Sequence, residues 1–115
     1  MDAIWSKMMP LYKTMLVTPE MRGDALLAEK IGLYRIAIQT FIDDAARRRH
    51  YDSGATLATY VNSTVPQWAE EAKSFVLWRD SVWTYSLQEL DRVREGERQQ
   101  PSIDEFLAEL PAFIV

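Results

Sequence analysis

Apolar residues recur every three to four positions through most of this chain, the spacing of helices that bury one face. Strand-like alternation of apolar and polar residues is absent. The spacing predicts an all-α fold, a small helical bundle built on two long antiparallel helices, at about residues 24–50 and 66–95, with short flanking helices. The first stripe carries Leu27, Ile31, Tyr34, Ile38, Phe41 and Ala45; the second carries Trp68, Ala72, Phe75, Val82, Trp83, Ser86, Leu90 and Val93.

Residues that begin helices precede these segments. Thr18-Pro19 offers an N-cap and a first-turn proline ahead of the first long helix, although Gly23-Asp24 is an alternative start. After a break at Tyr51-Asp52-Ser53-Gly54, Ser53 is expected to cap a short helix over about residues 54–62. These positions predict a chain that turns back within a few residues of His50.

The second long helix and a last short helix have their own boundary residues. Thr64 and Gln67 have the spacing of a capping box around Pro66, and Gly96 is expected to end the helix. Ser102 and Glu105 form a second capping box, which predicts a short helix to about Leu110. Phe106, Leu107 and Leu110 would dock that helix on the bundle, and an apolar tail follows Pro111.

The first 17 residues differ from the rest because they are apolar, rich in methionine and interrupted by Pro10. Leu33 and Ile36 lie off the main stripe of the first long helix, which indicates a second neighbour, and this segment is the natural one. We therefore expect a single helical domain over residues 1–115, with residues 1–17 as an N-terminal apolar arm.

Composition and charge exclude several classes of protein. With no cysteine and one histidine, neither a thiolate metal site nor a nucleophile–base pair of the usual kind can be built, and we expect no cofactor and no metal. A formal net charge of −4 argues against nucleic acid as a partner. No apolar stretch is long enough to span a membrane, and the N-terminus lacks the features of a signal peptide, so we expect a cytosolic protein without a membrane partner.

The polar candidates for chemistry have ordinary explanations. His50 follows three arginines, whose charge opposes its protonation and repels a metal cation. The adjacent acid pairs Asp43-Asp44 and Glu70-Glu71 point about 100° apart on a helix and do not converge. The run Arg47-Arg48-Arg49 suits the negative end of a helix dipole, and contact with an acidic protein or with nucleic acid are the alternatives. We expect no enzyme.

Arg79 lies near the middle of the apolar stripe of the second long helix. A buried guanidinium must be paired, and Asp43, Asp44 and Asp52 are candidate partners if the two long helices are antiparallel. The alternative is that Arg79 reaches a cleft and recognises a carboxylate or carbonyl of a partner.

Apolar and aromatic residues outside the stripes are the candidates for partner binding. Aromatic side chains at a rim often anchor protein interfaces, and methionine adapts to irregular apolar surfaces. The same residues could instead cover the core beneath the short helices, or mediate self-association into a homo-oligomer. The candidate partner-binding residues are Trp5, Met8, Met9, Leu77, Trp78, Arg79, Tyr85 and Phe113.

Residues of the first long helix and its break, Tyr34-Arg35-Ile36-Ala37-Ile38-Gln39 followed by Arg49-His50-Tyr51-Asp52-Ser53, resemble a small helical module of tailed-phage and prophage proteins. The second long helix, with Glu71-Ala72, Phe75 and Trp78-Arg79-Asp80-Ser81-Val82-Trp83, carries the most specific part of the resemblance. The closing Phe106-Leu107-Ala108-Glu109-Leu110-Pro111 fits as well, so that about residues 34–113 are covered.

This resemblance implies a tail-fibre-associated accessory or assembly protein. The leading hypothesis is therefore a non-enzymatic tail-fibre assembly chaperone or minor structural adaptor that works by binding another protein, in the host bacterial cytoplasm or in the virion tail. The alternative is a phage-encoded inhibitor of a host immune or regulatory factor, acting through an acidic helical surface. That surface would be formed by Glu70, Asp80, Asp91 and Glu95 on the outer face of the second long helix.

Overall fold

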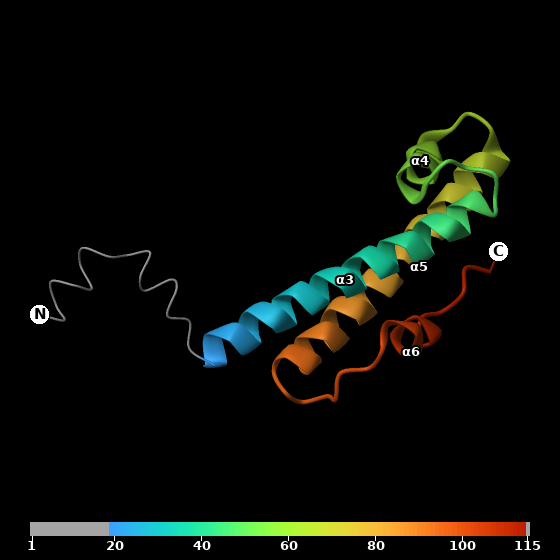
Figure 1. The fold of residues 1–115 in the computed structure, drawn as a ribbon. Helices are drawn as coiled ribbons and strands as arrows, with labels where there is room; N and C mark the ends of the chain where they lie inside the picture. The colour runs from blue at the N-terminus through green and yellow to red at the C-terminus, as the bar shows by residue number, and fades with distance from the viewer. Residues whose placement is uncertain (1–18, 115) are drawn as a thin grey trace, which may run out of the picture. The chain divides into compact units, whose positions relative to one another are not determined.

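A computed structural model describes residues 19–114, with side chains from Leu26 onward. The described chain is helical and contains no strand, which confirms the all-α class. Its elements, shown in Figure 1, are α3 (Pro19–Arg47), α4 (Gly54–Ala58), the 3-10 helix η1 (Thr59–Asn62), α5 (Pro66–Arg94) and α6 (Ile103–Ala108). None of the helices in residues 19–114 is long and apolar enough to cross a membrane.

The chain divides into two units, Met1–Ile31 and Gly32–Val115, and the boundary falls within α3. Of the first unit, only the helical residues from Pro19 onward are described. Residues 1–17, including Trp5, Met8 and Met9, lie outside the described residues, and the single domain over residues 1–115 stays a prediction. The second unit carries the core and the candidate site.

Inside the second unit, the core is formed by the second part of α3, by α4, α5 and α6. Most of the two predicted stripes are buried, but Phe41 and Trp83 are only partly so, and Trp68, expected in the core, is 47% exposed. Ile42, Ala46 and Ala69 are buried although they were not assigned to a stripe. The largest fully buried side chains are Ile38, Ile42, Leu57, Phe75, Val82, Ser86 and Phe106.

Both long helices end in the same kind of turn. The N–H of Tyr51 donates to the carbonyl of Ala46 after α3, and the N–H of Glu97 donates to that of Arg92 after α5, the long-range bond of a Schellman motif. The residue before each donor has a left-handed backbone: His50 at φ 74° and Gly96 at φ 78°. Gly96 ends α5 as predicted. Helix α3 begins at Pro19, one of the two predicted starts, but ends at Arg47 and not at residue 50, because its last carbonyls are satisfied by this turn.

The predicted helix starts are confirmed where the capping side chain accepts a hydrogen bond from a backbone N–H a few residues later in the chain. Ser53 caps α4, and Ser102 forms the predicted capping box with Glu105 at α6. The capping box between Thr64 and Gln67 is wrong, because Val65 is the N-cap residue of α5 and no side chain caps it. The predicted helix over residues 54–62 is α4 followed by η1.

Gly54 brings α4 into close contact with α3 and α5. Its N–H donates to Oδ1 of Asp43 at 2.8 Å, so that Asp43 is a structural acceptor and not part of a solvated acid pair. A Cβ atom at Gly54 would lie 3.1 Å from the Phe75 ring and 3.2 Å from Ile42. Only glycine allows this approach without displacing a neighbour.

The segment from Arg98 onward is held against the rest of the second unit by polar contacts. Arg98 pairs with Glu89 at 2.8 Å and also with Glu109, which in turn accepts the Tyr85 hydroxyl at 2.5 Å. The Tyr34 hydroxyl donates to the carbonyl of Pro101. The Arg98 guanidinium and the Tyr85 hydroxyl hold the pKa of Glu109 below its usual value. Together with the buried Phe106 and Leu110, these contacts position α6.

Candidate binding cleft

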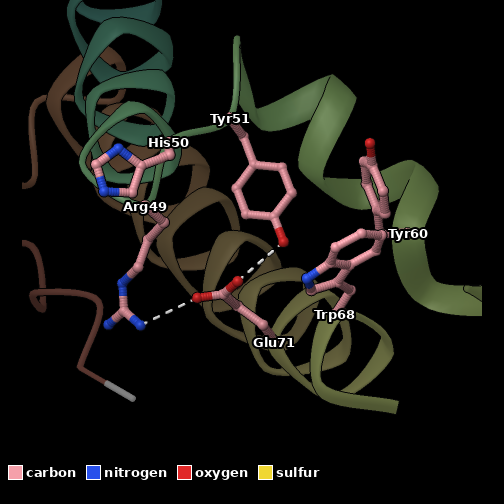
Figure 2. A pocket seen from close by; sticks show the side chains of 6 residues that line it. All are labelled: Arg49, His50, Tyr51, Tyr60, Trp68 and Glu71. Atoms are coloured by element: carbon pink, nitrogen blue, oxygen red, sulfur yellow. Dashed lines mark hydrogen bonds and ion pairs between the residues drawn. The ribbon is translucent and has the colours of Figure 1, made fainter. Parts of the chain in front are cut away.

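A hollow of about 310 Å³ lies where the turn after α3, the 3-10 helix η1 and the first turns of α5 meet. Figure 2 shows the six side chains around it. They belong to three separate segments of the sequence, 49–51, 60 and 68–71. The lining residues are Arg49, His50, Tyr51, Tyr60, Trp68 and Glu71.

Three aromatic rings form one side of this cleft. The ring centroids of Tyr51 and Tyr60 are 5.3 Å apart at an angle of 66°, and those of Tyr60 and Trp68 are 5.8 Å apart at 89°. Such edge-to-face pairs are favourable for aromatic quadrupoles, so the rings support one another while still offering faces to a ligand. Trp68 is the most exposed of the three, at 47%.

Glu71 is the polar centre of the cleft. Its Oε1 accepts the Tyr51 hydroxyl at 2.9 Å, and its Oε2 pairs with Nη1 of Arg49 at 3.2 Å, as the dashed lines in Figure 2 show. Burial of the phenol, together with the hydrogen bond to the Glu71 carboxylate and its charge, raises the pKa of Tyr51 to about 12. The Tyr51 hydroxyl is therefore a proton donor at neutral pH and does not act as a base.

Arg49 links the cleft to the C-terminal segment. Its guanidinium carbon lies 4.8 Å from the centre of the Phe113 ring, in cation–π geometry, while the same group pairs with Glu71. Phe113 also packs on Phe75 and Trp78, with centroids 5.5 and 5.2 Å away. The run of three arginines thus has a structural role at Arg49, and Arg47 pairs with Asp44 on its own helix.

Local backbone features bring the lining residues together. The left-handed His50 reverses the chain, so that Arg49 and Tyr51, on either side of it, both reach Glu71 on α5. Trp68 and Glu71 are three residues apart on α5 and therefore share a face of that helix. Trp68 was assigned to the core because helical periodicity does not separate a buried stripe from an exposed position beside it.

The predicted partner-binding residues fall into two groups. Leu77 is 74% exposed on α5. Trp78 donates from Nε1 to the carbonyl of Pro111 at 2.8 Å, and Tyr85 binds Glu109 and packs on Phe106. Trp78, Tyr85 and Phe113 therefore contact the C-terminal segment, and their role in partner binding stays a prediction.

Arg79 does not make the ion pair expected across the helices. It pairs with the neighbouring Asp80 at 2.9 Å, and its side chain is 34% exposed. The prediction of Asp43, Asp44 or Asp52 as its partner is wrong, because Arg79 lies at the edge of the stripe and can reach solvent. A guanidinium so placed needs no buried carboxylate.

On the predicted acidic face of α5, carboxylates form ion pairs with lysine or arginine side chains of the same helix. Glu70 pairs with Lys73, Asp80 with Arg79, and Asp91 with Arg94. Paired carboxylates on a solvated helix present little net negative field. The face is thus mixed in charge over most of its length.

Among residues 26–114, no three His, Asp or Glu side chains are grouped so that they could hold a metal ion. Tyr51, Tyr60 and Glu71 were not identified from the sequence, although each lies within a few residues of a predicted helix break. Comparisons with protein families, with curated proteins and with solved structures give no match for this chain.

Proposed function

We propose that this chain is a non-enzymatic binding protein and that the cleft around Trp68 is where it recognises another protein. One observation carries the proposal: Trp68 is 47% exposed at an open hollow and is supported by two tyrosine rings. Tryptophan and tyrosine are over-represented among residues that dominate binding energy, since they bury a large area at low entropic cost.

The architecture that supports this cleft is a pair of long helices, α3 and α5, which we propose to be antiparallel over the second unit. Two contacts favour this arrangement. Phe41 lies against Trp78 with ring centroids 5.8 Å apart, and Arg49, later in the chain, pairs with Glu71, earlier in α5. A rigid pair of helices would hold the aromatic rings in place before a partner arrives, which lowers the entropic cost of binding.

We further propose that the partner is a phage tail-fibre protein and that this chain is an assembly chaperone or minor structural adaptor for it. The resemblance over about residues 34–113 includes Tyr51, Trp68 and Glu71, three residues of the cleft. Such a protein would act in the host bacterial cytoplasm and could remain in the virion tail. Neither nucleic acid nor a membrane is part of this proposal.

The alternative, an inhibitor that presents an acidic helical surface to a host protein, has less support. Three of its four carboxylates, those of Glu70, Asp80 and Asp91, are paired with cations of α5. Glu95 is the exposed C-cap residue of α5 and is followed by Gly96. Capture of a host protein from lysate that weakens steeply with salt would favour this alternative.

Co-expression tests the leading proposal. The chain is produced together with a tail-fibre protein, which the proposal predicts to be encoded beside it, and complex formation is measured by size-exclusion chromatography with light scattering. We expect a stable complex that Trp68→Ala weakens by about tenfold or more, a loss typical of an aromatic anchor. Leu87→Ala is the control, because Leu87 is 40% exposed on α5 but does not line the cleft.

Two results would overturn the proposal. The first is that the two proteins stay apart when co-expressed. The second is that Trp68→Ala binds as tightly as the natural chain, which would place recognition elsewhere on the surface. Circular dichroism of both variants checks that they remain folded.

A further inference from the structure

The Trp68 indole gives the cleft a hydrogen-bond donor that the described chain does not use. Within the described chain, Nε1 of Trp68 has no hydrogen-bond partner. Figure 2 shows the indole nitrogen on the side of the ring that faces Tyr51 and Glu71. Each oxygen of Glu71 already accepts one bond, from Tyr51 or from Arg49. An indole N–H can only donate, so a ligand that pairs with Trp68 must supply an acceptor.

The charges of the cleft cancel. Glu71 and Arg49 form one ion pair, with side chains 24% and 27% exposed. A cationic ligand would approach Arg49 as well as Glu71, and an anionic ligand would meet the Glu71 carboxylate. Neither sign of charge is selected, and a neutral ligand leaves the pair intact.

The shape of the aromatic side favours a flat apolar group. The rings of Tyr60 and Trp68 meet at 89°, so that two ring faces border a corner. A pyrrolidine ring fits against such faces by van der Waals contact, and no hydrogen bond to the ring is needed.

From these three observations we infer that the cleft binds a proline-containing extended segment of the partner protein, an inference that rests on the proposed function. The amide before a proline carries a carbonyl acceptor for the Trp68 indole N–H and brings no N–H donor of its own. A polyproline II segment keeps its carbonyls free and loses little entropy on binding, which suits a hollow as open as this one.

The test uses short end-blocked peptides of proline and serine, and matched peptides with alanine at every proline. Affinities for the full chain are measured by fluorescence anisotropy of labelled peptides, and the ¹H–¹⁵N cross-peak of the Trp68 indole locates the binding. We expect saturable binding of the proline peptide, about tenfold weaker binding of the alanine peptide, and a shift of the Trp68 cross-peak.

Trp68→Phe separates the hydrogen bond from ring packing. It keeps an aromatic ring but removes the donor, and we expect about three- to tenfold weaker binding, the value of one net hydrogen bond. Trp83→Phe is the matched control, because Trp83 is partly buried on α5 and does not line the cleft. It should bind like the natural chain, and both variants retain enough apolar volume to fold.

Three outcomes overturn the inference: no saturable binding of the proline peptide at millimolar concentration, equal binding of the alanine peptide, or unchanged binding by Trp68→Phe. Preference for an end-blocked trimethyl-lysine peptide would overturn it too, and would show that cation–π attraction outweighs the neighbouring Arg49. In each case the co-expression test with Trp68→Ala still reports separately on the proposed function.

Discussion

His50 and Gly96 adopt the same left-handed backbone conformation after α3 and α5, but the conformational free energy that this costs differs between them. Gly96 has no Cβ and adopts φ 78° freely, whereas His50 adopts φ 74° against steric repulsion between its Cβ and the backbone. The cost at His50 is offset by the Schellman hydrogen bonds after α3. Because Arg49 and Tyr51 flank it, the turn also shapes the cleft.

Replacing His50 by glycine and replacing Gly96 by alanine should change the free energy of unfolding in opposite directions. We expect His50→Gly to stabilise the protein by about 0.5–1 kcal/mol, because relief of strain exceeds the greater entropy of an unfolded glycine. Gly96→Ala should destabilise by about 1–2 kcal/mol; a Cβ there meets nothing within 4 Å, so the cost is conformational. Urea denaturation measures both, and His50→Ala, which keeps the strain, is the control. A destabilised His50→Gly would contradict this account.

Tyr51 predicts how stability depends on alkaline pH. Its pKa of about 12 in the folded protein exceeds the ordinary 10.0, so the folded state keeps the phenolic proton after the unfolded state has lost it. The stabilisation is fully present below pH 10 and is lost as pH rises through 12; because solvent screens this partly exposed phenol, its total stays below about 2 kcal/mol.

The measurement for Tyr51 is the free energy of unfolding by urea between pH 9 and about pH 11.5. Stability of the natural chain should fall more steeply than that of Tyr51→Phe, which has no proton to lose. Tyr60→Phe is the control, because the Tyr60 hydroxyl does not contact Glu71. Parallel curves for the natural chain and Tyr51→Phe would exclude a raised pKa at Tyr51.

At the scale of elements, α4 is positioned by one close approach to its neighbours. Gly54 is the first residue of α4. A Cβ atom placed on Gly54 would lie 3.1 Å from Oδ1 of Asp43 and 3.1 Å from the Phe75 ring. Phe75 is fully buried and cannot move aside cheaply. The position of α4 in turn determines where η1 and Tyr60 lie.

Two glycine-to-alanine changes separate this packing effect from helix propensity. Gly54→Ala should destabilise by about 1–3 kcal/mol, because the added methyl overpacks the contact with Phe75 and Ile42. Gly32→Ala, within α3, should stabilise by up to about 1 kcal/mol, since a Cβ there meets nothing within 4 Å and alanine favours helix. Thermal unfolding followed by circular dichroism distinguishes the two. Equal effects of the two changes would mean that Gly54 is not tightly packed.

How far the sequence predicts each element depends on the range of the interactions involved. Ser53, Ser102 and Gly96 act on backbone groups within a few residues, and their roles were predicted correctly. Trp68 and Arg79 were misplaced because the boundary of a buried stripe depends on what packs over it. The cleft was missed for the same reason: Tyr51, Tyr60 and Glu71 meet only through tertiary packing.

At the scale of the folded unit Gly32–Val115, the C-terminal segment connects α6 to the cleft. Trp78 binds the carbonyl of Pro111, and Phe113 fills the space among Phe75, Trp78 and Arg49. Since Arg49 also holds Glu71, the packing of Phe113 and the geometry of the cleft share one side chain. Phe113, a candidate for partner binding, packs on two aromatic residues within this unit.

Phe113 provides the test of this connection. Phe113→Ala should destabilise the protein by about 1–3 kcal/mol, because a half-buried ring is removed from two aromatic neighbours. Ile114→Ala, at a side chain that is 85% exposed, should change stability by less than about 0.5 kcal/mol. Urea denaturation compares the two. With Arg49 no longer held over Phe113, we also expect the Trp68 indole cross-peak to shift in Phe113→Ala and to stay in place in Ile114→Ala. A stable Phe113→Ala with an unshifted Trp68 would show that the tail and the cleft are independent.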